Sequence, residues 1–129
     1  MILECEGKQP LQHPNPKQTR NVISALRSYG PSSYASLTKE DGSYLQVAGG
    51  GISCLLEFYR ADLRERHRAY GDVVNKACPD GTILVCGSGN ISMQSDEWLR
   101  SELVADVFCA FLQDADFLAY VHWRPSPGF

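Results

Sequence analysis

Charged and aromatic side chains gather where one predicted strand ends and the next begins. Glu57, Tyr59 and Arg60 close the first segment, and His67 and Arg68 follow a short distance downstream. If the two segments pair as antiparallel neighbours, Glu57 or Tyr59 lies near His67 or Arg68. Such a charged and aromatic surface strip is suited to binding a ligand or another protein. The alternative is a solvated cross-strand ion pair, worth at most about 1 kcal/mol when exposed.

A second candidate for partner binding is the pair Trp123 and Arg124 near the carboxyl end. Tryptophan and arginine are enriched among the residues that dominate binding energy at protein interfaces. A tryptophan near the end of a chain can instead close the hydrophobic core, and the sequence leaves both roles open. The complete candidate set for partner binding is Glu57, Tyr59, Arg60, His67, Arg68, Trp123 and Arg124.

Nucleophilic chemistry would have to come from the cysteines and histidines. The 5 cysteines are an odd set without a Cys-x-x-Cys spacing, so neither a disulfide framework nor a zinc site is expected. Cys54, Cys86 and Cys109 stand in apolar surroundings that favour buried free thiols. Because a cysteine and a histidine from distant positions can meet in a folded chain, a small Cys/His-dependent enzyme stays open as a less favoured alternative. The residues concerned are Cys5, Cys54, Cys78, Cys86, Cys109, His13, His67 and His122.

Two glycine-rich motifs fall short of the patterns that bind nucleotides. Residues 87–89 read Gly-Ser-Gly, but Ser92 stands where a dinucleotide loop has its third glycine. Residues 49–51 read Gly-Gly-Gly and lack the Lys-Ser/Thr of a phosphate loop. Both motifs are interpreted as turns, and the acidic pairs at 40–41 and 114–116 as solvated charges. The sequence therefore predicts no catalytic residue, no cofactor and no metal site.

The composition of the chain indicates which classes of protein it can belong to. A chain of 129 residues with 43% hydrophobic and 21% charged residues is typical of one soluble globular domain. A net charge of −3 disfavours non-specific binding to nucleic acid. The first residues lack the basic and apolar regions of a signal peptide, and no stretch reaches the roughly 20 apolar residues of a membrane helix. We therefore expect a cytoplasmic protein that does not associate with membranes.

The strands that must position these residues are predicted from alternation and turn residues. Residues 33–60 are typical of a three-stranded β-meander, with Asp41-Gly42 in the first turn and residues 49–51 in the second. A short strand is expected at 1–5 and a weaker one at 67–74, after a charged loop. The apolar run at 81–87 is predicted to be a central strand, and 117–123 a last strand.

Two helices complete the expected fold. The first covers 19–29 with Thr19 as its cap, and the second covers 95–113 with Ser95 as its cap and two acids in its first turn. Residues 1–18 are interpreted as a proline-containing extension and 125–129 as a tail. The chain is thus predicted to be a single α+β domain over 1–129. Its antiparallel-dominated sheet has five to seven strands, with two helices packed mainly on one face.

The predicted helices and strands contain a set of hydrophobic and polar residues at particular positions along the chain. The positions are Val22, Ile23, Leu26, Leu37, Thr38, 41–47, 56–60, His67, Arg68 and 121–124. This arrangement, over residues 19–124, resembles small immunity proteins of bacterial polymorphic-toxin systems, which act in contact-dependent competition. The resemblance implies a non-catalytic protein that binds a cognate toxin domain in the producing cell and neutralises it without turnover.

The sequence is also compatible with a ligand-binding function, and with assembly into a homodimer. A small-molecule or peptide-binding module would use a pocket between the sheet and the late helix, lined by Val104, Phe108 and Phe111. Such a module would have a cavity where an immunity protein has core. An exposed last strand could also pair between two chains, so a homodimer is possible.

Overall fold

The predicted meander forms the centre of a seven-stranded antiparallel sheet in the computed structural model, which describes residues 1–127. The strand order is β2-β1-β3-β4-β5-β6-β9. These strands are β1 (Ile2–Cys5), β2 (Leu11–Gln12), β3 (Tyr34–Thr38), β4 (Tyr44–Gly50), β5 (Ser53–Arg60), β6 (Glu65–Tyr70) and β9 (His122–Pro125). The turn at Asp41-Gly42 connects β3 and β4 as the sequence predicts. The turn from β4 to β5 is Gly51-Ile52 instead of residues 49–51, because Gly49 and Gly50 still pair with Cys54 and Ser53 as part of β4.

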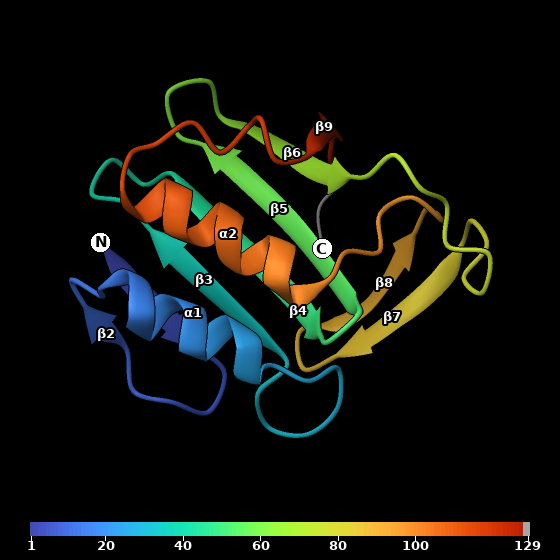
Figure 1. Ribbon diagram of the computed structural model, residues 1–129, viewed down its shortest axis with the longest axis horizontal. Helices are drawn as coiled ribbons and strands as arrows, with labels where there is room; N and C mark the ends of the chain where they lie inside the picture. The colour runs from blue at the N-terminus through green and yellow to red at the C-terminus, as the bar shows by residue number, and fades with distance from the viewer. Residues whose placement is uncertain (128–129) are drawn as a thin grey trace.

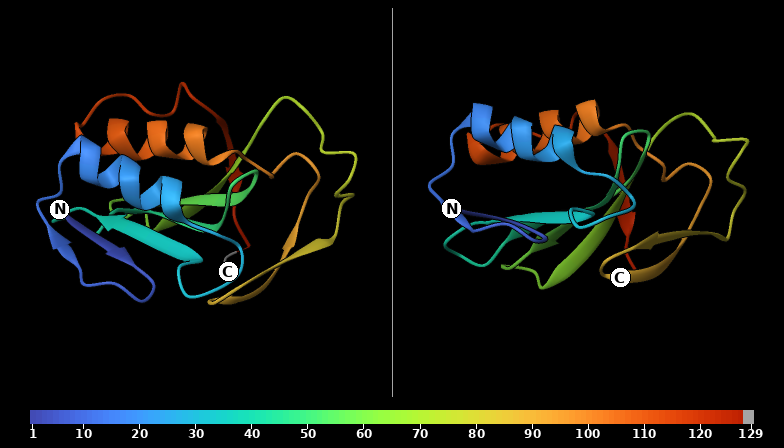
Figure 2. Two further views of the ribbon diagram at one scale, coloured as in Figure 1. Left: turned by 60° about the horizontal axis from the view of Figure 1, so that its bottom comes forward. Right: turned by 90° about the horizontal axis from the view of Figure 1, so that it is seen from below.

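Two helices, α1 (Pro16–Ala25) and α2 (Ser101–Leu112), lie side by side on one face of this sheet (Figures 1 and 2). The main core fills the space between them and the sheet, where Leu45, Leu56 and Phe108 are fully buried. The predicted α+β class, with two helices on one sheet face, is therefore confirmed. Neither helix within residues 1–127 has the length and apolar composition needed to cross a membrane.

Helix α1 begins earlier than predicted, at Pro16. Asn15, not Thr19, is its cap: the Gln18 N–H donates to Asn15 Oδ1 (2.7 Å), and the Asn15 N–H donates to Gln18 Oε1 (3.0 Å). This capping box satisfies two backbone donors, and Pro16 is favourable in a first helical turn because its missing N–H would have no partner there. The predicted extension at 1–18 thus supplies two strands of the sheet and the first helical residues.

Helix α2 begins later than predicted, at Ser101. Ser95 is not its cap, and the helix has no side-chain cap, since Arg100 occupies that position. Asp96 and Glu97 do not complement the helix dipole; both form ion pairs with arginines of the sheet. These long-range ion pairs hold Asp96 and Glu97 against the sheet in a turn and an irregular segment before α2, which is why the helix starts six residues after the predicted cap.

The apolar run at 81–87 is not a central strand. It forms β7 (Thr82–Cys86), whose one partner strand within residues 1–127 is β8 (Gly89–Met93), in a separate hairpin. Gly87-Ser88 makes the turn between them, and Gly89 begins β8. Leu84 is buried, whereas Ile83 and Val85 are 48% and 61% exposed. One side of the hairpin therefore packs on the sheet face opposite the helices, where Leu84, Ile91 and Met93 form a second core with Ala48 and Leu55.

Two strand boundaries also differ from the prediction. The strand expected at 67–74 is β6, Glu65–Tyr70, so the charged loop before it is shorter. The strand expected at 117–123 is β9, His122–Pro125, and it forms one edge of the sheet beside β6. Phe117 is instead buried in the main core from the connection that precedes β9.

Gly50 allows β4 to pass close to the end of α1. A Cβ atom there would lie 2.2 Å from the Leu26 carbonyl oxygen and 2.6 Å from Arg27 Cα, both backbone atoms. We expect Gly50→Ala to lower the free energy of unfolding by about 1–3 kcal/mol, as measured by urea denaturation, because the two backbones must separate.

The matched control for this prediction is Gly71→Ala. A Cβ on Gly71 would meet only Leu99 Cδ2 at 4.0 Å, an ordinary contact. This control should change the free energy of unfolding by less than about 0.5 kcal/mol. Equal stabilities for the two variants would show that the close approach of β4 to residues 26–27 is wrong.

Candidate functional site

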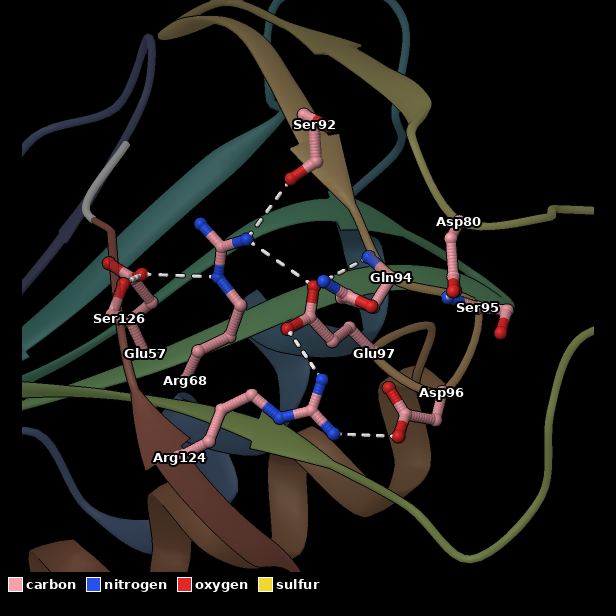
Figure 3. Close-up of polar contacts among 10 residues, drawn as sticks. All are labelled: Glu57, Arg68, Asp80, Ser92, Gln94, Ser95, Asp96, Glu97, Arg124 and Ser126. Atoms are coloured by element: carbon pink, nitrogen blue, oxygen red, sulfur yellow. Dashed lines mark hydrogen bonds and ion pairs between the residues drawn. The ribbon is translucent and has the colours of Figure 1, made fainter.

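Arg68 is the centre of a buried polar network on the sheet face opposite the helices (Figure 3). The predicted pairing of the two segments is confirmed, with Glu57 directly across from Arg68. Arg68 Nε lies 3.3 Å from Glu57 Oε2, and Arg68 Nη1 lies 3.3 Å from Glu97 Oε1 and donates to the Ser92 carbonyl (3.1 Å). The Arg68 and Glu57 side chains are only 2% and 1% exposed. The expected surface strip is therefore an interior ion pair at this position.

Arg124 extends the network from β9, where it lies directly across from Arg68. Its guanidinium donates to Glu97 Oε2 (3.3 Å) and to Asp96 Oδ2 (2.6 Å), and it lies 4.0 Å from the centroid of the Tyr70 ring. Glu97 thus bridges two arginines, and its negative charge offsets the repulsion between these adjacent cations. This role for Glu97 was not predicted, because its partners are about thirty residues away in the sequence.

Glu57 accepts hydrogen bonds from two residues besides Arg68. Gln46 Nε2 donates to Glu57 Oε1 (3.4 Å), and the Ser126 hydroxyl donates to Glu57 Oε2. Burial raises the pKa of Glu57, and the neighbouring Arg68 only partly opposes this. A carboxylate held in this way by several donors links β5, β6 and the chain after β9.

The other predicted site residues do not join this network. Tyr59 stacks on Tyr44 with ring centroids 5.1 Å apart. Arg60 Nη2 pairs with Asp62 at 3.0 Å, and His67 Nε2 lies 3.6 Å from Glu65 Oε2. The candidate set thus divides into an interior group and a more exposed group near the β5–β6 turn.

Trp123 closes the core, one of the two roles left open by the sequence. Its ring lies 5.9 Å from that of Phe58 and 5.8 Å from that of Phe117, in edge-on geometry. Such aromatic pairs add stability beyond the area that they bury. Trp123 is therefore part of the aromatic cluster that holds β9 and the connection before it against the sheet.

The network also fixes the segment from Gln94 to Leu99, which carries no regular secondary structure. The Gln94 N–H donates to Glu97 Oε1 (2.7 Å). The Gly71 N–H donates to the Asp96 carbonyl (2.9 Å), and the Asn75 N–H donates to the Ser95 carbonyl (2.8 Å). Leu99 exchanges two backbone hydrogen bonds with Cys54. The chain before α2 and the loop after β6 are therefore held in one arrangement.

These two segments, together with the start of α2 and the connection before β9, surround a concave site that we call the loop groove. It has a volume of about 700 Å³. Its walls carry exposed apolar side chains, with Val73 82% exposed and Leu118 and Tyr120 each 49% exposed. His122 Nε2 lies 2.6 Å from Asp72 Oδ1 at the rim. The lining residues are Gly71, Asp72, Val73, Trp98, Leu99, Arg100, Leu103, Leu118, Ala119, Tyr120, Val121 and His122.

None of the predicted site residues lines the loop groove. Its walls come from the loop after β6, the start of α2 and the connection before β9, so no local pattern brings these residues together. Val73 and Leu118 are exposed apolar residues of the groove. Because both lie near the ends of predicted strands, the sequence pattern assigned them to the sheet and did not indicate a binding surface. The pocket that a ligand-binding module would form at Val104, Phe108 and Phe111 is not where the groove lies, because these side chains are at most 1% exposed in the main core.

The thiols are buried or half-buried in this fold. Cys54 and Cys109 are buried as expected, whereas Cys86 is only half-buried in the hairpin. Within residues 1–127, no cysteine forms a hydrogen bond with a histidine and no three His, Cys, Asp or Glu side chains group as metal ligands. Burial raises the pKa of Cys54 to about 12.

This raised pKa predicts that Cys54 is chemically slow. Fewer than about one in ten thousand Cys54 thiols is ionised near neutral pH, and the thiolate is the reactive form. We expect iodoacetamide at about pH 7.5 to modify Cys54 only in urea, as followed by timed labelling and peptide mass spectrometry. Cys78, half-buried outside the strands, is an internal reference. Rapid labelling of native Cys54 would contradict its placement in the core.

Comparison with protein-family models, with curated protein sequences and with solved structures gives no significant match to this chain. The functional argument therefore depends on the geometry of the chain itself. That geometry consists of a network in which Glu57, Asp96 and Glu97 each pair with an arginine of the sheet, and of an open groove with apolar walls.

Proposed function

We propose that this chain is a non-catalytic immunity protein that binds and neutralises a cognate toxin domain in the cytoplasm of a bacterium. The observation that carries the proposal is the loop groove. Contiguous exposed apolar side chains on a small domain mark interaction sites more often than scattered ones do. Trp98, Arg100 and Tyr120 line this groove, and Trp, Arg and Tyr are the residue types that dominate binding energy at interfaces.

The size of the domain is sufficient for such binding. A standard protein interface covers about 800 Å² on each partner. The accessible surface of this chain is 6979 Å², so an interface of that size would take about one-ninth of it. The groove would form its concave centre, and the polar residues around the groove its rim.

Rigidity of the groove also favours binding to another protein. Asp96 and Glu97 are held by Arg124 and Arg68, and the residues that follow them line the groove. A binding surface that is already ordered loses less conformational entropy on association. The buried network is thus interpreted as the support of the binding surface.

A second candidate function is a small-molecule binding module that uses the same groove. The volume of about 700 Å³ falls within the range of ligand pockets, about 300–1,000 Å³. Thermal-shift measurements with metabolite mixtures distinguish the two functions. A small-molecule module gains stability from one mixture, whereas an immunity protein gains it only from its toxin domain.

The proposed function is tested by recovery and neutralisation of the toxin. Tagged protein is used to isolate partners from its source cells, and a recovered toxin domain is then co-expressed with the chain in a susceptible bacterium. We expect growth to be restored by the wild-type chain and lost with the double variant Leu118→Gln/Tyr120→Ala. Its matched control, Ile83→Gln/Tyr29→Ala, removes an aliphatic and an aromatic side chain of comparable or greater exposure elsewhere. Toxicity that is unchanged by the wild-type chain would reject the proposal.

A further inference from the structure

We infer that the loop groove recognises an apolar segment of its protein partner through two features, large apolar side chains in the groove and a carboxylate placed against Arg100. The inference rests on the proposed function for the identity of the partner as a protein. It adds the chemistry by which that partner is recognised, and therefore the residues that distinguish a cognate toxin domain from others.

The apolar part of the inference follows from the exposed groove walls. Val73, Leu118 and Tyr120 expose roughly half or more of their surface in one concave site. Transfer of this remaining apolar surface from water into an interface is favourable in proportion to the area that is covered. A partner segment with two or three large apolar side chains would cover this surface and fill the groove.

The expectation of a carboxylate on the partner depends on Arg100. Four other arginines, Arg20, Arg60, Arg68 and Arg124, each pair with a carboxylate of this chain. The exposed guanidinium of Arg100 has no hydrogen bond or ion pair within residues 1–127, although it lies in the wall of an apolar groove.

The acid of the groove does not supply this partner. Asp72 is paired with His122 at 2.6 Å, so the groove has one cation without an acid of its own. A partner carboxylate would complement Arg100, and the apolar segment that covers the groove would shield this pair from water, which strengthens a charge-assisted hydrogen bond. A partner with a lysine or arginine at that point would be rejected by like charge, which supplies specificity.

The test uses a random 12-residue peptide library displayed on phage and selected against the full-length folded chain. The Leu118→Gln/Tyr120→Ala variant serves for counter-selection. We expect enriched peptides to share two or more large apolar residues and an Asp or Glu at a fixed distance from them. One enriched peptide is then synthesised, and its affinity is measured by fluorescence anisotropy.

Substitution of Arg100 provides the decisive comparison. We expect Arg100→Ala to weaken binding of the synthetic peptide by about tenfold or more, and replacement of the peptide acid by its amide to weaken it equally. The two changes together should cost little more than either one. Arg64→Ala removes another exposed arginine, on the β5–β6 turn outside the groove, and should leave the affinity within about twofold. Thermal unfolding of each variant verifies that it is folded.

Either of two results would overturn the inference. These are enriched peptides without an acid, and an affinity that Arg100→Ala leaves unchanged. Failure of the inference is distinguishable from failure of the proposed function. If a toxin domain is neutralised equally by the wild type and by the groove variant, the function stands and the inference fails. If acidic, apolar peptides bind through Arg100 but no toxin domain is neutralised, the proposed function fails.

Discussion

Replacing Arg68 with methionine should lower the free energy of unfolding by about 3–5 kcal/mol, the usual cost of removing one partner from a buried ion pair. Arg68 is 2% exposed and contacts both Glu57 and Glu97. Methionine fills part of the volume but leaves both carboxylates without this cation. Equilibrium denaturation in urea at about pH 7 measures the loss.

The pH dependence of this variant provides a second readout. Burial already raises the pKa of Glu57 in the wild type, and Arg68 is the main influence that lowers it. Without Arg68, the folded-state pKa of Glu57 should rise further above its unfolded value. Such an acid contributes stability that is present below its unfolded pKa and is lost as pH rises through its folded pKa. The difference in stability between wild type and Arg68→Met should therefore be smaller at about pH 4.5 than at about pH 7.

An exposed arginine is the control for this prediction. Arg60 pairs with Asp62 at 3.0 Å, and its side chain is 43% exposed. We expect Arg60→Met to change the free energy of unfolding by less than about 1 kcal/mol, because exposed ion pairs are weak. A loss for Arg68→Met as small as that for Arg60→Met would contradict the buried network.

The second large effect is expected for Phe108→Ala, which should lower the free energy of unfolding by about 3–5 kcal/mol. Phe108 is 0% exposed in the core between α2 and the sheet. Removing its ring leaves a cavity that the surrounding strands and helices cannot fill without moving. The same urea denaturation measures this loss.

The control for Phe108 is Tyr29→Ala. Tyr29 is 75% exposed, so its truncation should cost less than about 0.5 kcal/mol. The comparison also tests the alternative of a ligand pocket beneath α2. If Phe108→Ala were as mild as Tyr29→Ala, Phe108 would line an existing cavity and the core assignment would be wrong.

Local patterns were sufficient to predict the meander and the class of the fold. Asp41-Gly42 forms the tight turn that its sequence predicts, and the second reversal lies at Gly51-Ile52, which ends one residue beyond the predicted Gly-Gly-Gly. Gly42, Gly49 and Gly51 adopt positive φ angles. Antiparallel pairing also predicted that Glu57 or Tyr59 lies near His67 or Arg68, and the structure pairs Glu57 with Arg68. Each of these predictions depends on residues close in sequence or on adjacent strands.

Errors arose where distant contacts override local preference. The run at 81–87 contains enough apolar residues for a central strand, yet Ile83 and Val85 face outward because the hairpin packs by one side only. Ser95 has the character of a helix cap, but ion pairs of Asp96 and Glu97 with the sheet delay α2. The loop groove combines three connections that are far apart in the sequence, so no pattern within any one of them identifies it.

The central claim is that the loop groove forms the binding surface, and hydrogen–deuterium exchange of the chain with and without its toxin domain tests it most directly. We expect bound toxin to slow exchange at residues 71–74, 98–103 and 118–122, while residues 34–46 of the central sheet keep their free-state rates. Protection confined to residues 34–46, or to the β5–β6 turn at 60–66, would contradict the account and place the binding surface on the open part of the sheet.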